Sequence, residues 1–179
     1  MEIAVLRLVH ILFGILWVGG AVTVGWFVVP SVNEAGPAGG AVMNGIVAKR
    51  KFPQAMSLFG LLTIVSGARL YMLKVFGANG FNSAWLMTPE GIVLTLGGLL
   101  AVAGFFIGVF VQRPIAMRLQ ALGGEIAAGG GPPNPAQVEE LGALKSRMQK
   151  LGLVLAGHLG AAALLMASMR LAQTLSVYM

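Results

Sequence analysis

Four long apolar runs constrain this chain more than any other feature of its sequence. They cover about residues 3–29, 53–76, 91–111 and 151–177, and each is long enough to cross a hydrocarbon core of about 30 Å as a helix. Of the 179 residues, 57% are hydrophobic and 10% are charged. We therefore predict an all-α, polytopic membrane protein, in which one membrane domain of four transmembrane helices forms an up-down bundle in the lipid bilayer.

The basic residues indicate how these helices are oriented. Lys49, Arg50 and Lys51 lie between the first two runs, and five more Lys and Arg residues lie between the third and fourth runs. The connection between the second and third runs has only Lys74, which Glu90 offsets in charge. By the positive-inside rule, the two basic connections are cytoplasmic and both termini face outward. In a bacterium, the chain would be a multi-pass protein of the cytoplasmic (inner) membrane with periplasmic termini.

The formal net charge of +6 does not indicate a nucleic-acid partner. The cations are concentrated at the predicted membrane boundaries, whereas nucleic-acid binding proteins carry them on a continuous basic surface interleaved with aromatic side chains. No nucleic acid is therefore expected among the partners.

The third and fourth helices are predicted to continue into the cytoplasm as a helical hairpin over about residues 113–150. Ile115, Leu119 and Leu122 recur at helical spacing on one arm, and Asn134 with Gln137 matches the capping box that begins a helix. Pro114 predicts a kink or a short break. The apolar stripes of the hairpin have two readings: contact with other subunits of a membrane complex, or packing of the two arms against each other.

Most enzyme signatures are missing from the sequence. There is no cysteine, no HExxH, no Rossmann or P-loop fingerprint, and no carboxylate pair within an apolar run. Redox chemistry through a bound cofactor remains possible, because the cofactor itself carries that chemistry. The sequence therefore does not decide whether the chain is an enzyme.

An ionisable pair in the first apolar run, Arg7 and His10, marks the candidate site. Ionisable residues are rare inside membranes and usually face a cavity, another helix or a bound group. In an up-down bundle, the same level near the outer ends holds glycines, methionines and arginines of the other helices: Arg69, Gly97, Gly98, Met166, Met169 and Arg170.

These residue types predict a haem b site between the helices. His10 would ligate the iron, Met169 or Met166 would supply a second ligand, and arginines would pair with the propionates. Gly97 and Gly98 would leave space for the macrocycle.

Other interpretations remain open at this stage. His10 is also suited to a hydrogen bond with a neighbouring helix, the arginines to reaching lipid headgroups, and the glycines and methionines to packing. Copper is the alternative metal, since His10 together with Met72, Met166 and Met169 forms a soft ligand set suited to Cu(I). A cofactor-free accessory subunit is the third hypothesis. His158 lies about 14 Å from His10 in axial height, so we expect it to pack or to form a hydrogen bond rather than share a cofactor with His10.

The first helix also resembles a known group of proteins. Residues 8–12 (LVHIL) and 16–20 (LWVGG) resemble the first helix of bacterial multi-helix membrane proteins. This group includes the CopD copper-resistance domain, the HemJ-type protoporphyrinogen oxidases and the membrane domain of cytochrome-linked urate oxidases, and the resemblance is strongest to uncharacterised CopD-like members. It implies that His10 is a haem ligand and that the function is electron transfer or porphyrin chemistry.

Overall fold

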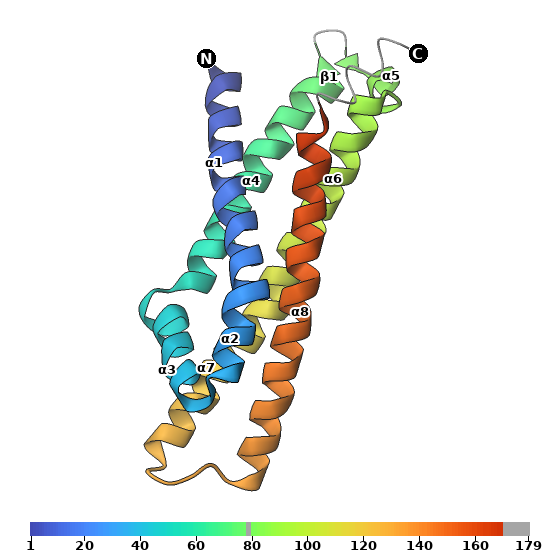
Figure 1. Ribbon diagram of the computed structural model, residues 1–179. Helices are drawn as coiled ribbons and strands as arrows, with labels where there is room; N and C mark the ends of the chain where they lie inside the picture. The colour runs from blue at the N-terminus through green and yellow to red at the C-terminus, as the bar shows by residue number, and fades with distance from the viewer. Residues whose placement is uncertain (78–79, 170–179) are drawn as a thin grey trace.

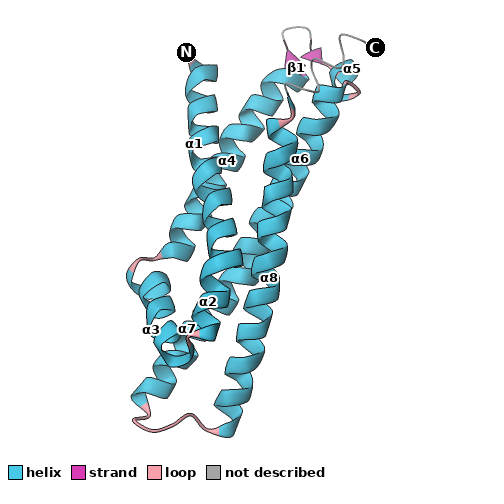
Figure 2. Ribbon diagram, viewed as in Figure 1, coloured by secondary structure: helices cyan, strands magenta, loops and turns pink. Residues whose placement is uncertain are grey.

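The computed structural model describes residues 1–77 and 80–169. Within these residues, four continuous helices are long and apolar enough to cross a membrane: Glu2–Glu34, Phe52–Val75, Pro89–Ala128 and Pro135–Ala167. Figure 1 shows them side by side, with consecutive long helices running in opposite directions. Figure 2 shows that the connections between them contain further short helices, two short strands and loops. The prediction of an all-α fold with four long apolar helices is confirmed.

The first helix is longer than predicted and contains a wider, π-helical turn. It consists of α1 (Glu2–Thr23), the π-helical turn η1 (Val24–Val28) and α2 (Val29–Glu34). Pro30 follows the π turn by two residues. Proline has no N–H group, and its ring clashes with the carbonyl four residues earlier, so a widened turn lets the helix continue past it.

The third helix passes its proline in the same way. α6 (Pro89–Ile107) leads through the π turn η3 (Gly108–Gln112) into α7 (Arg113–Ala128), and Pro114 again lies two residues after the π turn. The kink or break predicted at Pro114 is therefore a π-helical turn, and the helix remains continuous.

The basic connection after the first helix is itself helical, which the sequence analysis did not predict. It contains α3 (Gly36–Asn44) and the π turn η2 (Gly45–Lys49), and α4 (Phe52–Val75) follows. Lys51, which precedes α4, has a left-handed backbone with φ of 51°, so the chain changes direction there.

The connection between α4 and α6 contains two short strands and one short helix, also not predicted. β1 (Phe76–Gly77) pairs antiparallel with β2 (Gly80–Phe81), and α5 (Ser83–Leu86) follows. Thr88 caps α6 as its sequence indicates, because its hydroxyl accepts a hydrogen bond from the Gly91 N–H. These elements lie at the same end of the bundle as the start of α1 (Figure 1), which we call the terminal end.

The last helix, α8, spans Pro135–Ala167 and begins at the predicted capping box. The Asn134 side chain accepts from the Gln137 N–H, and the Gln137 side chain accepts from the Asn134 N–H. The part of the predicted fourth helix over residues 170–177 lies outside the described residues. The opposite end of the bundle, where α7 and α8 are joined, is called the hairpin end.

The helices pack in a closed ring in which α1 contacts α4 and α8, and α6 contacts α8 and α4. Trp17 of α1 is 5% exposed and anchors the core together with apolar residues of α6 and α8: Ala101, Leu155, Leu159 and Ala162. Gly60 of α4 admits this packing, because a Cβ atom there would lie 2.9 Å from the Trp17 ring and 2.8 Å from the Phe105 ring. The core therefore lies at the middle of the ring, where all four helices meet.

The hairpin formed by α7 and the first half of α8 has an apolar stripe that is largely covered by the chain itself. Ile115 and Leu122 of α7 are buried, the latter to 1% exposure. Both α2 and η2 add contacts at this end, including a hydrogen bond of 3.3 Å from Asn33 to Gln149. Of the two readings of the stripe, packing within the chain has the better support.

An exposed ion-pair network ties the two arms of this hairpin together. Arg118 of α7 donates to both carboxylate oxygens of Glu140 on α8, at 2.7 and 2.9 Å, and also to Glu125. The hydrogen bonding from Arg118 lowers the pKa of the Glu140 carboxyl. The pair therefore stays charged into mildly acidic solution.

Close contact between η1 and α8 gives a first prediction. A Cβ atom at Gly25 would lie 2.5 Å from the Gly152 carbonyl oxygen, whereas Gly19 of the same long helix has open space around it. We expect Gly25→Ala to lower the free energy of unfolding by about 1–3 kcal/mol, the usual cost of overpacking. Gly19→Ala should leave it unchanged or slightly raise it, because alanine favours helices. Unfolding by SDS in mixed micelles, followed by circular dichroism, measures both, and equal effects would contradict the close contact.

Candidate functional site

His10 lies on the face of α1 that packs against α4. Its Nδ1 atom is 2.8 Å from the carbonyl oxygen of Thr63, which is buried in the middle of α4. A carbonyl oxygen only accepts hydrogen bonds, so Nδ1 carries the proton and donates it. The bond therefore fixes the neutral ring as the Nδ1–H tautomer.

Gly67 provides the space for the imidazole ring. A Cβ atom at Gly67 would lie 2.6 Å from His10 Cε1 and 2.9 Å from Nδ1, so no larger residue fits without moving the ring. The Thr63 carbonyl also accepts a 3.1 Å hydrogen bond from the buried Ser66 hydroxyl. The small glycine and this polar carbonyl together hold the ring against α4 in one orientation.

The second ring nitrogen of His10 remains available. Within the part of the chain that the structure describes, Nε2 has no hydrogen-bond partner, and it is not enclosed by other atoms. With Nδ1 protonated, Nε2 carries a lone pair directed away from its own hydrogen bond. A histidine whose Nδ1–H is held by a carbonyl is the usual arrangement for metal ligation through Nε2.

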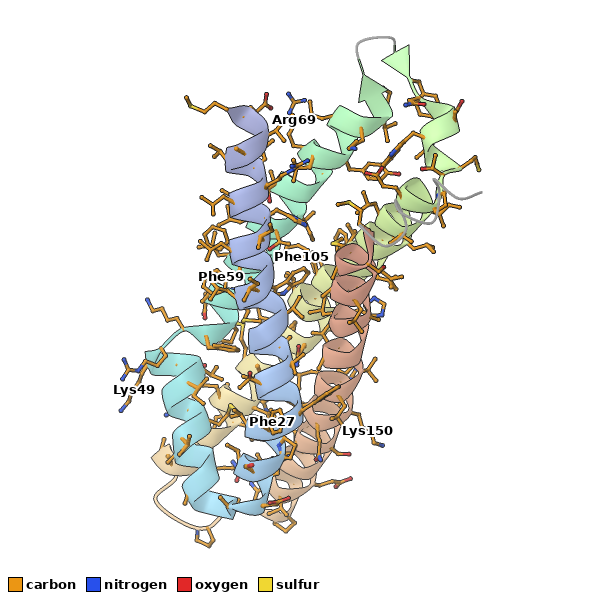
Figure 3. All side chains as sticks on the ribbon, turned by 45° about the horizontal axis from the view of Figure 1, so that its top comes forward. Phe27, Lys49, Phe59, Arg69, Phe105 and Lys150 are labelled. Carbon is orange, nitrogen blue, oxygen red and sulfur yellow. The ribbon has the colours of Figure 1, made fainter. Side chains whose placement is uncertain are left out.

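The predicted arginine partners lie apart from the imidazole. Arg69 of α4 forms an ion pair of 2.8 Å with Glu2 at the start of α1, and both side chains are about half exposed. Figure 3 shows Arg69 beside the beginning of α1. Arg7 is exposed, and Arg170 lies outside the described residues. Arg7 is therefore the site arginine that has no competing carboxylate among the described residues.

The predicted glycines and methionines divide between packed and open positions. Gly97 of α6 faces α8, and a Cβ atom there would lie 3.1 Å from Met166 Cγ. Met166 also packs against the core cluster around Trp17, so the space at Gly97 is filled. Gly98 has nothing within 4 Å of a Cβ position, and Met169 is half-buried. Gly97 therefore packs against Met166, whereas His10 packs against α4.

His158 of α8 repeats the hydrogen bonding of His10 at a second helix interface. Its Nε2 atom donates to the carbonyl oxygen of Leu100 on α6 at 2.9 Å. It also lies beside a glycine, since a Cβ atom at Gly104 would be 3.4 Å from His158 Cδ2. The expectation of a packing or hydrogen-bonding role for His158 is confirmed.

A polar cluster at the terminal end was not identified from the sequence. Tyr71 of α4 forms a 2.6 Å hydrogen bond with Thr95 of α6, and its ring lies edge-on to Trp85. Lys74 pairs with the largely buried Glu90 carboxylate at 3.1 Å. Lys74 and Glu90, which flank this connection, can be read from the sequence. Whether they pair depends on how α4 tilts towards α6.

The copper alternative gains no ligand cluster from this geometry. Among the described residues, the structure brings together no group of three or more His, Cys, Asp and Glu side chains. A copper site would have to use His10 with methionines, and Met166 already packs against α6. Of the predicted copper ligands, Met166 is held in packing, whereas Met72 of α4 is exposed and His10 keeps a free ring nitrogen.

Comparison with known protein families, with curated proteins and with solved structures found no match.

The opposite hydrogen bonding of the two histidines gives a second prediction. His10 should be the Nδ1–H tautomer and His158 the Nε2–H tautomer in mildly alkaline solution, because each donates from a different nitrogen to a carbonyl oxygen. Nitrogen NMR of the protein labelled at its two histidines distinguishes the tautomers by chemical shift. His158→Phe assigns the signals, and a shared tautomer would contradict the geometry described above.

Proposed function

We propose that the chain spans the bacterial cytoplasmic membrane four times, with the terminal end outside and the hairpin end in the cytoplasm. The basic residues support this orientation, since the connections at the hairpin end contain eight Lys and Arg residues but four Glu. The alternation of helix direction along the chain agrees with it (Figure 1).

Labelling of single cysteines tests this orientation, because the natural chain has none. Ser83 at the terminal end, and Ser31 and Ser146 at the hairpin end, are all exposed. A membrane-impermeant thiol reagent should label Ser83→Cys in intact cells, and Ser31→Cys and Ser146→Cys only after permeabilisation. The reverse pattern would overturn the orientation.

We further propose that the protein binds haem b through His10 and serves in electron transfer or porphyrin chemistry. One observation carries this proposal: the Thr63 carbonyl holds His10 Nδ1–H, which leaves Nε2 free as a ligand atom. Such a hydrogen bond fixes the ring orientation and raises the basicity of the ligating nitrogen. Haem bound at this position would supply one-electron redox chemistry.

The other residues of the proposed site differ in how much each would have to rearrange to contact haem. Arg7 lies one helical turn from His10 on α1 and is exposed, so its guanidinium suits a propionate carboxylate. Arg69 would have to exchange Glu2 for a propionate. Met169 is preferred over Met166 as a second ligand, because Met166 would have to leave its packing against Gly97.

A cofactor-free accessory subunit is the second candidate, and His158 is the observation that favours it. His158 makes an equivalent hydrogen bond between helices, so a histidine in this fold can act as a packing residue alone. The same hydrogen bond makes His158 a matched control for His10.

The decisive experiment compares His10→Ala with His158→Ala after expression with ample haem. Each substitution removes one hydrogen bond between helices, which contributes on the order of 1 kcal/mol, so both proteins should remain folded in the membrane. We expect a Soret band in the purified natural protein and in His158→Ala, and its loss in His10→Ala.

Two results would overturn the haem proposal. A natural protein without Soret absorbance supports the cofactor-free subunit, and copper at about one ion per chain by metal analysis supports the copper alternative. A Soret band that survives in His10→Ala would show that another residue holds the iron.

A further inference from the structure

Three consecutive cations stand at the point where the chain turns from η2 into α4. Lys49, Arg50 and Lys51 are all exposed, and we call them the basic corner. The left-handed backbone of Lys51 turns the chain here, and the Lys51 carbonyl accepts hydrogen bonds from Gln54 and Ala55. The corner is thus a fixed turn at the start of α4.

No carboxylate neutralises the basic corner. Within the described residues, none of its three side chains takes part in an ion pair or hydrogen bond. Glu125 and Glu140, which lie on the same end of the molecule, are both held by Arg118. The corner therefore presents uncompensated positive charge.

A fourth cation lies on the element that η2 contacts. η2 packs against α7, whose first residue is Arg113. The Arg113 side chain is half-buried, and its Nε atom is enclosed without an acceptor in the described part of the chain. Its terminal Nη atoms are not enclosed and have no partner among the described residues, so they are open to an acceptor from outside the chain.

The basic corner stands where the apolar part of the bundle ends. Exposed Leu58 and Leu61 follow on α4, and exposed Trp26 and Phe27 lie on η1. Tryptophan at such a position is typical of the level of lipid headgroups. Figure 3 shows Lys49 on one side of the bundle and Lys150 on the other, so the cations of α8 form a separate group.

We propose that the basic corner and Arg113 together bind the headgroup of an anionic phospholipid. A phosphodiester oxygen provides the acceptor that Arg113 lacks, since guanidinium groups bind phosphate through paired N–H donors. The exposed Lys49, Arg50 and Lys51 add attraction for the negative charge, while the apolar faces of η1 and α4 contact the acyl chains.

Native mass spectrometry of the full chain with phosphatidylglycerol and phosphatidylcholine tests this site. The corner variant carries Lys49→Gln, Arg50→Gln and Lys51→Gln, and the control carries Lys145→Gln, Arg147→Gln and Lys150→Gln. Both variants remove three cations from the hairpin end, so they differ in where the charge is removed and not in how much is removed. Each cation at such a surface contributes about fivefold to binding of anionic lipid. The preference for phosphatidylglycerol over phosphatidylcholine should therefore fall at least about tenfold in the corner variant.

The control should retain most of that preference, and Arg113→Gln alone should lower it. Equal losses in the corner variant and the control would show diffuse attraction and overturn the site, as would no loss in the corner variant. If the corner variant does not fold, Arg50→Gln alone replaces it, with Arg147→Gln as its control and the same criteria. Displacement of the lipid by millimolar inorganic phosphate would assign the site to a free anion and contradict the lipid proposal.

Discussion

Close contact between helix backbones is the constraint on which this structure depends. Lipid tails are as apolar as the side chains that face them, so helices in a bilayer associate through tight packing and hydrogen bonds between helices. Gly25 meets the backbone of Gly152 where η1 crosses α8, and Gly60 admits Trp17 to the centre of the bundle. Larger residues at these points would separate the helices and expose the core around Trp17.

Polar groups inside the bundle are placed so that almost all are satisfied by helix backbones. Thr63 and Ser66 donate their hydroxyl groups to carbonyls of their own helix, and the two histidines donate to carbonyls of neighbouring helices. A histidine has two ring nitrogens, however, and one such bond uses only the first. The free Nε2 of His10 is thus a consequence of the way the helices are joined, and His158 keeps a free Nδ1 for the same reason.

The two ends of the bundle differ in how far their cations are paired with carboxylates. At the terminal end, Lys74 pairs with Glu90 and Arg69 with Glu2, so opposite charges join neighbouring helices. At the hairpin end, Arg118 takes two of the glutamates, and the basic corner and Arg113 keep their charge uncompensated. The uncompensated cations of the hairpin end therefore attract anionic groups from its surroundings.

The sequence by itself determined the long helices and where several of them begin. Apolar runs and caps depend on residues close together in the chain, which is why the cap at Asn134 could be identified without a structure. The π turns before Pro30 and Pro114 were missed, because proline indicates an obstacle to the helix but not how the helix accommodates it. The helical connection over Gly36–Asn44 was missed too, since its glycines and proline are typical of loops.

Tertiary structure alone decided the partners of the candidate site. The level of each residue along a helix follows from counting, so the sequence placed His10, Gly97 and Met166 in one layer. Which of them meet depends on the rotation and tilt of each helix, and these are set by contacts between residues far apart in the chain. Packing turned His10 towards Thr63 and Gly67, Gly97 towards Met166, and Arg69 towards Glu2. The sequence therefore gives the chemical groups and their depth, and only the packed bundle decides which of them touch.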